Sequence, residues 1–323
     1  MGNPLIAVAD SPFPNLDPAQ AVLSEMDAEM VMASEPTVEG ILDVAAEADG
    51  LIVTYAQITA DVIAGMKKCK VIGRFGLGVD NIDIPAATKA GIAVVYVPDY
   101  CIDEVSDHTM AMLLDLARKV SFSNQLVQAG RWEMPAVTPL SRLRGRVLGL
   151  AGFGQIPRAV APKAQAFGLQ VISSDPFVDA GIAAAMDVEL VNFETLLKMS
   201  DYVSVHVPMM PETKGLFGAE AFAQMKPEAL LVNTARGPLV DTDALAAALD
   251  AGQLAGAALD VVPVEPLPAG SPLLGRDNVI LSPHTAFYSI EALEELQTKT
   301  ARGVVDVLSG KRPVYPINPE VLD

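Results

Sequence analysis

Short apolar runs alternate along this chain with segments whose apolar residues recur every three or four positions. In the first third of the chain the runs predict strands at 5–9, 29–32, 50–54, 71–74 and 93–96. The segments between them predict helices at 18–26, 38–48 and 60–67. Repeated alternation of strand and helix is typical of a parallel sheet covered by helices, so we expect an α/β fold.

The alternation resumes after Pro98, which ends the first series of elements. One long helix is predicted at 103–129, where it would lead into a second domain. Further strands are predicted at 147–151, 171–174, 202–207, 230–233, 256–260 and 279–281. A last long helix is predicted at 289–309, and we expect the tail at 312–319 to pack on the first domain.

Length and composition indicate the number of domains and the cellular compartment. A chain of 323 residues, 51% of them hydrophobic, is too long for one ordinary core and predicts two globular domains. No apolar stretch reaches the length of a membrane span, and the start lacks the basic region of a secretory signal. With only two cysteines, Cys69 and Cys101, no disulfide framework is expected. We therefore expect a cytoplasmic protein with no membrane partner.

The formal net charge is −18, from 22 basic and 40 acidic residues. Repulsion from phosphate backbones argues against nucleic acid as a partner. The net charge does not exclude anionic small molecules as ligands, because a single arginine can locally outweigh the average negative potential of the protein.

A glycine-rich turn follows the predicted strand at 147–151. Gly152 and Gly154 allow the tight turn and close backbone approach that a pyrophosphate needs at a helix N-terminus. The third position of this fingerprint is Pro157, which is tolerated in a first helical turn but could change how the helix packs. Asp175, about 20 residues after Gly154, would bind the ribose hydroxyls and repel a 2′-phosphate. The pattern favours NAD over NADP.

Three residues near the ends of later strands combine a cation, a carboxylate and a titratable base. Arg236 could bind a carboxylate bidentately and polarise an adjacent keto oxygen. His284 could donate a proton to that oxygen or accept one in the reverse direction. A nearby carboxylate such as Glu265 would favour the charged ring, although the spacing leaves their contact open. This set is suited to hydride exchange at a carbon next to a carboxylate.

The chain has two other histidines. His206 follows a predicted strand, and we expect it to line the cofactor. His108 lies in the helix at 103–129 beside acidic residues, and a capping or interdomain role is expected for it rather than chemistry. No pair of histidines has metal-ligand spacing and the cysteines lie elsewhere, so no metal site is expected.

Together these segments resemble the D-isomer-specific 2-hydroxyacid dehydrogenase family over almost the whole chain. The shared motifs are Gly76-Leu-Gly-Val-Asp-Asn-Ile-Asp83, Gly152-Phe-Gly, Asp175-Pro176, His206-Val-Pro-Met-Met-Pro-Glu-Thr213, Asn233-Thr-Ala-Arg-Gly237, Ala258-Leu-Asp260, Glu265-Pro266 and Ser282-Pro-His284. The segments 97–101, 104–109 and 287–289 look most like the C-terminal-binding-protein branch and its bacterial relatives. The segment 73–76 is similar to the phosphoglycerate dehydrogenase branch.

The resemblance implies two doubly wound parallel-sheet domains with a cleft between them. Residues 1–98 and 287–323 would form a flavodoxin-like substrate-binding domain, and 99–286 an inserted Rossmann NAD-binding domain. It also implies a homodimer formed through the cofactor domain, which suits the long apolar helix after Pro98.

The resemblance assigns Arg236 as substrate anchor, His284 as acid/base and Glu265 as its partner. Asp260 and Thr234 would face the nicotinamide, and Thr109 the cofactor. The expected cofactor-binding set is Thr109, Gly152, Gly154, Gln155, Ile156, Asp175, His206, Val207, Pro208, Thr213, Thr234, Ala235, Arg236, Asp260 and His284.

A second set of residues is expected to bind the substrate. It comprises Tyr55, Arg74, Leu77, Gly78, Arg236, His284 and Phe287. Leu77 and Gly78 would offer backbone amides to the substrate carboxylate, and Phe287 would shape the side-chain pocket. Arg74 could meet a phosphate or second carboxylate, or equally form an interdomain salt bridge.

Two functions from different classes follow. The favoured one is an NAD-dependent oxidoreductase that interconverts a small 2-keto acid and a D-2-hydroxy acid. The alternative is an NAD(H)-sensing, co-repressor-like binding protein with little turnover. Against the alternative, the chain has a full catalytic set, no basic DNA-binding segment and no extended tail.

Overall fold

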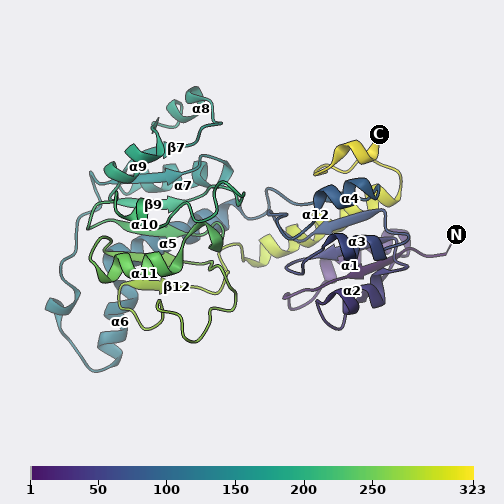
Figure 1. The fold of residues 1–323 in the computed structure, drawn as a ribbon, viewed down its shortest axis with the longest axis horizontal. Coiled ribbons are helices and arrows are strands. Elements are labelled where there is room, and N and C mark those ends of the chain that lie inside the picture. The colour runs from purple at the N-terminus through teal and green to yellow at the C-terminus, as the bar shows by residue number, and fades with distance from the viewer. Residues whose placement is uncertain (1) are drawn as a thin grey trace. The chain divides into compact units, whose positions relative to one another are not determined.

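A computed structural model describes residues 2–323; Met1, the first residue of the expected substrate domain, lies outside the described residues. The chain divides into two compact units. The first contains the residues up to Tyr100 together with Ser289–Asp323, and the second is Cys101–Tyr288. Figure 1 shows the C-terminal helix α12, in yellow, beside the purple N-terminal elements of the first unit.

The first unit is a five-stranded parallel sheet with the order β2-β1-β3-β4-β5. This is the flavodoxin-like order that the sequence predicts. Its strands are β1 (Leu5–Val8), β2 (Glu29–Met32), β3 (Gly50–Val53), β4 (Val71–Arg74) and β5 (Ala93–Val95). Its helices are α1 (Asp17–Leu23), α2 (Val38–Ala45), α3 (Ala60–Gly65), α4 (Ile84–Lys89) and α12 (Ile290–Leu308).

Local sequence explains where these helices begin. The side chains of Thr37, Thr59 and Asp83 each accept a backbone N–H from the first turn of α2, α3 and α4. Such caps satisfy donors that a helix leaves unpaired. On β4, a side chain at Gly73 would lie 2.9 Å from methyl groups of α12, so the glycine permits the close approach of that helix.

The C-terminal tail packs on the first unit, as the sequence predicts. The Ile317 N–H donates to the Val94 carbonyl at 2.8 Å, and the Asn318 side chain accepts the Val94 N–H at 2.8 Å. Asn318 is buried, and its amide also donates to the Ile92 carbonyl. The last residues therefore extend the edge of the sheet at β5.

The second unit is a seven-stranded parallel sheet with the order β12-β11-β10-β9-β6-β7-β8. This is the doubly wound Rossmann order with one further strand, so the predicted fold class is confirmed. Its strands are β6 (Val147–Ala151), β7 (Gln170–Ser174), β8 (Val188–Leu190), β9 (Tyr202–Val205), β10 (Leu230–Asn233), β11 (Gly256–Leu259) and β12 (Val279–Leu281).

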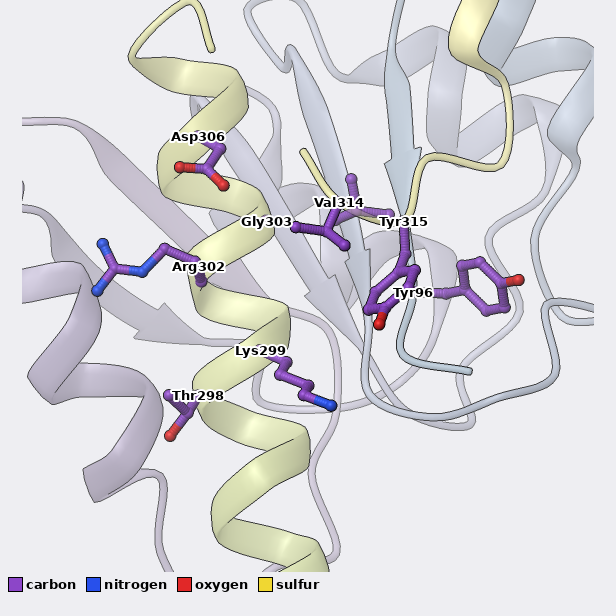
Figure 2. A pocket seen from close by; sticks show the side chains of 9 residues that line it. Tyr96, Thr298, Lys299, Arg302, Gly303, Asp306, Val314 and Tyr315 are labelled. Carbon is purple, nitrogen blue, oxygen red and sulfur yellow. The ribbon is translucent and has the colours of Figure 1, made fainter. Parts of the chain in front are cut away.

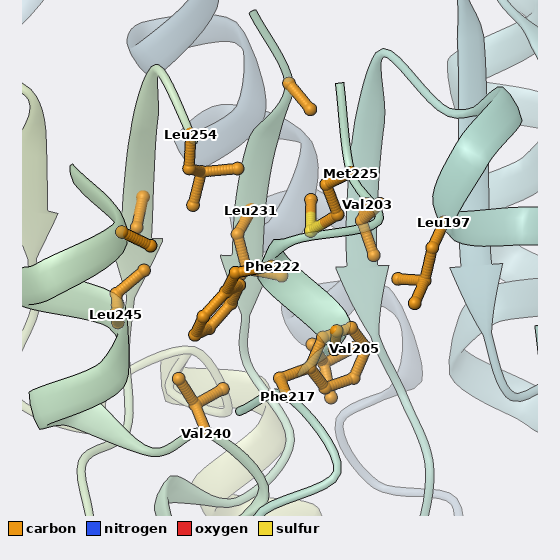
Figure 3. Close-up of a cluster of buried hydrophobic side chains, with 14 of the residues drawn as sticks. Leu197, Val203, Val205, Phe217, Phe222, Met225, Leu231, Val240, Leu245 and Leu254 are labelled. Carbon is orange, nitrogen blue, oxygen red and sulfur yellow. The ribbon is translucent and has the colours of Figure 1, made fainter. Parts of the chain in front are cut away.

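Helices cover both faces of this sheet. The helices of this unit are α5 (Ile102–Arg118), α6 (Val120–Gln128), α7 (Gln155–Ala166), α8 (Ala180–Ala184), α9 (Phe193–Met199), α10 (Ala219–Phe222) and α11 (Thr242–Asp250), and all but α6 contribute to the two cores beside the sheet. One core joins α9, α10 and α11 to the strands; Figure 3 shows Leu197, Phe222 and Leu231 in it. The other joins α5, α7 and α8 to the opposite face. Strands buried on both faces explain the continuous apolar runs in the sequence.

The prediction of one helix over 103–129 is wrong. The helix α5 ends at Arg118, Lys119 adopts a left-handed conformation with φ 53°, and α6 begins at Val120. The Asp115 carboxylate accepts the Ser121 N–H and stabilises the new helix start. No glycine or proline marks this break. The strand β8 and the helix α4 were also missed, and predicted strands 202–207 and 256–260 end earlier, at Val205 and Leu259.

Candidate active site

The predicted site residues of the second unit follow one edge of its sheet. Gly152, His206, Thr234 and Asp260 come directly after β6, β9, β10 and β11, and His284 comes shortly after β12. Every strand pair in this sheet is parallel, so these carboxyl ends meet at the same edge. Ligand sites of open α/β sheets occur at this edge.

His284 and Glu265 are in contact. Nδ1 of His284 lies 2.8 Å from Oε2 of Glu265, and the other carboxylate oxygen accepts the Val262 N–H at 3.1 Å. Burial opposes ionisation of Glu265, but the His284 ring, the Val262 N–H and the charge of Arg236 hold its pKa below the usual range. An ionised carboxylate only accepts, so Nδ1 carries a hydrogen and Nε2 is the nitrogen that gains or loses a proton.

The backbone of His284 is held in an uncommon conformation. Its φ is 55°, in the left-handed region that residues other than glycine rarely adopt. Its N–H donates to the Asp260 carbonyl at 2.8 Å, and the Asp260 carboxylate accepts the N–H groups of Thr285 at 2.9 Å and Ala286 at 3.0 Å. Asp260 is only 2% exposed. Its carboxylate thus fixes the loop that carries His284, and its expected contact with nicotinamide stays a prediction.

Arg236 lies on a tight turn after β10. The buried side chain of Asn233 accepts the Ala235 N–H at 3.0 Å and donates to the Arg236 carbonyl at 2.9 Å. Nη1 of Arg236 donates to the Ala235 carbonyl at 2.8 Å. The side chain is half-buried, and its charge acts on Glu265. Asn233 therefore fixes the turn that carries Arg236, and residue chemistry alone does not identify it.

Gly237 brings the Arg236 turn against the loop that carries Glu265. A Cβ at this position would lie 2.0 Å from the carbonyl carbon of Val262 and 2.5 Å from the nitrogen of Pro263. Only a residue without a side chain permits this backbone approach.

We expect Gly237→Ala to lower the free energy of unfolding by about 1–3 kcal/mol, because the added methyl group meets backbone atoms that cannot turn away. Denaturant unfolding measures the change. Gly270→Ala is the matched control, since a Cβ there meets nothing within 4 Å. Equal effects of the two substitutions would contradict the close-approach argument.

The glycine turn after β6 has the geometry of a nucleotide site. Gly152 has φ 99°, and a Cβ there would lie 2.9 Å from the His206 carbonyl. Gly154 is the N-cap of α7, and a Cβ there would meet nothing within 4 Å, so the helix N-terminus is open to a ligand. Pro157 is buried in the first turn of α7, which runs uninterrupted from Gln155.

Asp175 follows β7 and faces this turn. One oxygen accepts the Phe153 N–H at 2.9 Å and the other accepts the Phe177 N–H at 2.9 Å. Each carboxylate oxygen can still accept a second hydrogen bond, as a ribose hydroxyl requires. The glycine turn, the helix N-terminus and this carboxylate therefore fit a dinucleotide.

His206 is not suited to carrying a proton at neutral pH. Burial lowers the pKa of His206 to about 3, so its ring is neutral. Its Nε2 lies 2.9 Å from the Ser204 hydroxyl. The expected contact of His206 with the cofactor stays a prediction.

Other residues of the expected cofactor set are engaged within the second unit. Thr109 is buried; its hydroxyl donates to the Val105 carbonyl at 2.7 Å and lies 2.8 Å from the Thr234 hydroxyl. The Thr213 hydroxyl accepts the Met210 N–H and donates to the Pro208 carbonyl, and these two bonds stabilise the turn after β9. Gln155 and Ile156 open α7, Val207 follows His206, and Ala235 belongs to the Arg236 turn. Their roles toward the cofactor stay predictions.

Phe287 is the expected substrate residue that the structure places beside His284. The two rings meet edge to face, with centroids 6.1 Å apart. Both side chains belong to the second unit.

The remaining expected substrate residues lie at the carboxyl edge of the first unit's own sheet. Tyr55 follows β3, is 41% exposed, and its N–H donates to Asp10 at 2.7 Å. Arg74 ends β4, and its Nη1 donates to the Phe75 carbonyl at 2.7 Å. Gly76 has φ 147°, and a Cβ there would coincide with the Arg74 guanidinium. Leu77 and Gly78 follow in the same loop, and the substrate roles of all these residues stay predictions.

A separate cavity of about 310 Å³ lies in the first unit between α12 and the tail (Figure 2). Tyr96, Lys299, Arg302 and Tyr315 are among its lining residues. Lys299 pairs with Asp99 and Glu295, and Arg302 pairs with Glu25. Because carboxylates already pair with Lys299 and Arg302, neither cation favours the binding of an anionic substrate in this cavity.

Membrane spans and metal clusters are both absent from the part of the chain that the structure describes. Among residues 2–323, no helix combines the length and the apolar character needed to cross a membrane. Within the same range, no group of three or more His, Cys, Asp or Glu side chains is placed to hold a metal ion.

Comparison with known proteins identifies the family. Residues 110–286 match the family described as "D-isomer specific 2-hydroxyacid dehydrogenase, NAD binding domain". The glyoxylate reductase of Thermofilum pendens is 39% identical over 276 residues, which are 82% of this chain and 80% of the relative. The chain therefore belongs to the D-isomer specific 2-hydroxyacid dehydrogenase family. This confirms the resemblance inferred from the sequence and NAD as the cofactor.

Two further similarities place the chain within the family. The D-3-phosphoglycerate dehydrogenase of Methanocaldococcus jannaschii is 39% identical over 292 residues, 90% of this chain but 55% of the relative. The chain thus spans about half the length of that relative, and the similarity supports the phosphoglycerate-dehydrogenase-like branch. A solved protein from Thermus thermophilus, TT0316, has a TM-score of 0.89 and 34% identity, covering 97% of this chain and 99% of its own.

Proposed function

We propose that this protein is an NAD-dependent oxidoreductase that interconverts a small 2-keto acid and the corresponding D-2-hydroxy acid. The observation that carries the proposal is the His284–Glu265 pair, with the charge of Arg236 acting on it at the sheet edge that also carries the glycine turn. An acid/base group, its carboxylate partner and a carboxylate-binding cation are what such a reaction requires.

In the proposed mechanism, NAD supplies or takes up the hydride when bound. Arg236 binds the substrate carboxylate and polarises the keto oxygen through its planar guanidinium. His284 holds a proton at Nε2 and gives it to that oxygen during reduction; in the other direction the neutral ring accepts it. Glu265 keeps the ring oriented through Nδ1 and stabilises its charged form. Phe287 packs beside the ring and limits the side chain of the substrate.

The direct test is NADH consumption with a panel of 2-keto acids that includes glyoxylate and pyruvate, and NAD reduction with D-3-phosphoglycerate. Glyoxylate and D-3-phosphoglycerate are included because they appear in the names of the relatives. Stoichiometric NADH oxidation by at least one member supports the proposal. If NADH binds and no member turns over, the NAD(H)-sensing binding protein replaces the enzyme.

Cofactor choice gives a separate prediction. Asp175→Ala removes the charge that would repel a 2′-phosphate and also the acceptor for the Phe153 N–H. We expect the ratio of kcat/KM for NADPH over NADH to rise about 10-fold, with weaker NADH binding. Asp175→Asn is the matched control, because it keeps an acceptor for the Phe153 N–H. It should raise the ratio with less loss of NADH affinity, and an unchanged ratio in both variants would refute this role of Asp175.

We also propose that the protein assembles as a homodimer through the segment 120–134. Four large apolar side chains of this segment are exposed: Val120, Val127, Trp132 at 88% and Met134 at 72%. Exposed apolar side chains concentrated in one segment indicate an interaction surface. We propose that this surface binds the same segment of a second copy of the chain.

The cytoplasmic location expected from the sequence stays a prediction.

Trp132 is the only tryptophan of the chain, so its fluorescence reports on this surface. We expect a dimer mass by light scattering and a shift of the emission to shorter wavelength as the concentration rises. Trp132→Ala should shift the mass toward the monomer. Phe177→Ala removes a comparably exposed aromatic ring elsewhere in the second unit and should leave the mass unchanged. A monomeric wild type, or equal masses for both variants, would rule out this interface.

A further inference from the structure

His108 reaches the loop that carries the proposed acid/base residue. It lies on α5, and its Nε2 is 3.2 Å from the Ser282 hydroxyl, just after β12. The Ser282 hydroxyl lies 2.6 Å from Oδ1 of Asp260. Nε2 of His108 is also 3.6 Å from the same carboxylate oxygen. All three residues belong to the second unit.

The hydrogens of this chain of contacts can be assigned. An ionised Asp260 can only accept, so the single hydroxyl hydrogen of Ser282 points to Asp260. Ser282 must then accept from His108, which places a hydrogen on Nε2 of His108. The direction is His108 to Ser282 to Asp260.

The network ends on the backbone that holds His284. The Asp260 carboxylate accepts the N–H groups of Thr285 and Ala286, and the Asp260 carbonyl accepts the N–H of His284. His284 has the left-handed φ of 55°. A residue other than glycine keeps such a conformation only when several surrounding contacts hold it there.

We propose that His108 is a positioning residue for His284, acting through Ser282 and Asp260. Its donated hydrogen bond orients the Ser282 hydroxyl, which in turn fixes the carboxylate that binds the Thr285 and Ala286 amides. The kinetic part of this proposal rests on the proposed oxidoreductase function. His108 itself exchanges no proton with the substrate.

The first test measures the loop without measuring turnover. Amide hydrogen exchange at Thr285 and Ala286 is compared in the wild type, His108→Leu and His108→Gln. We expect about 5- to 10-fold faster exchange in His108→Leu, and wild-type exchange in His108→Gln, whose amide also donates to Ser282. The Val147 amide, which binds the Asp201 carboxylate at 2.8 Å, is the internal control and should not change.

The second test is kinetic. His108→Leu and Ser282→Ala should each lower kcat about 10-fold with NADH affinity within about twofold of the wild type, and His108→Gln should restore kcat. Because both residues act through one path, the double variant should lose no more than either single variant.

Unchanged exchange in His108→Leu, equal losses in His108→Leu and His108→Gln, or additive losses in the double variant would each overturn the proposal. Faster exchange with an unchanged kcat would also reject the role toward His284. If the wild type turns over no 2-keto acid, the oxidoreductase function fails. The exchange data then still decide whether His108 holds the loop.

Discussion

Replacing His284 by alanine is expected to lower kcat by about 10²- to 10⁴-fold, the range that a positioned acid/base group contributes. NADH binding should remain nearly intact, because the glycine turn and Asp175 that fit the dinucleotide lie in other loops. Steady-state kinetics with the best 2-keto acid measure the first effect, and titration of NADH fluorescence measures the second.

Glu265→Gln is the companion variant. It keeps a group that can accept the hydrogen bond from Nδ1 of His284 but removes the charge that stabilises the protonated ring. We expect a smaller loss of kcat than in His284→Ala. Loss of NADH binding together with turnover in His284→Ala would show that its role as the acid/base group had been misassigned.

Arg236→Lys should lower kcat/KM for the 2-keto acid about 100-fold or more, although the positive charge is retained. Lysine cannot offer the two parallel donors that bind a carboxylate bidentately, and truncating one partner of such a charged pair costs about 2–5 kcal/mol. Steady-state kinetics at varied substrate concentration measure the effect.

The matched control for Arg236→Lys is Arg276→Lys, because Arg276 binds the Asp250 carboxylate through two parallel hydrogen bonds in the same unit. This control should keep the kcat/KM of the wild type, since Arg276 and Asp250 belong to none of the expected site residues. A loss in Arg236→Lys no larger than in the control would remove Arg236 from the substrate site.

The sequence could predict what depends on neighbours along the chain. Apolar runs located both sheets, and the positions of Thr234, Asp260 and His284 relative to those runs placed them at one sheet edge. Residue chemistry alone named Arg236, Glu265 and His284. The break at Lys119 was beyond such reasoning, because its left-handed conformation is supported by Asp115 rather than by a glycine.

Contacts between distant segments could not be read from the pattern. The approach of Gly237 to Val262 depends on the exact path of two loops. His108, expected to have a capping or interdomain role, contacts Ser282 in its own unit. Asp260, expected to face the nicotinamide, directs its carboxylate to the Thr285 and Ala286 amides. In each case the partner lies more than 20 residues away in the sequence.

In the proposed reaction, hydride passes from NADH to the keto carbon with D stereochemistry. The most direct measurement uses NADH deuterated at both C4 positions of the nicotinamide, followed by mass spectrometry and chiral chromatography of the product. We expect a D-2-hydroxy acid carrying one deuterium at C2, and far slower formation of this product in His284→Ala. A product without deuterium, or one of L configuration, would contradict the proposed reaction.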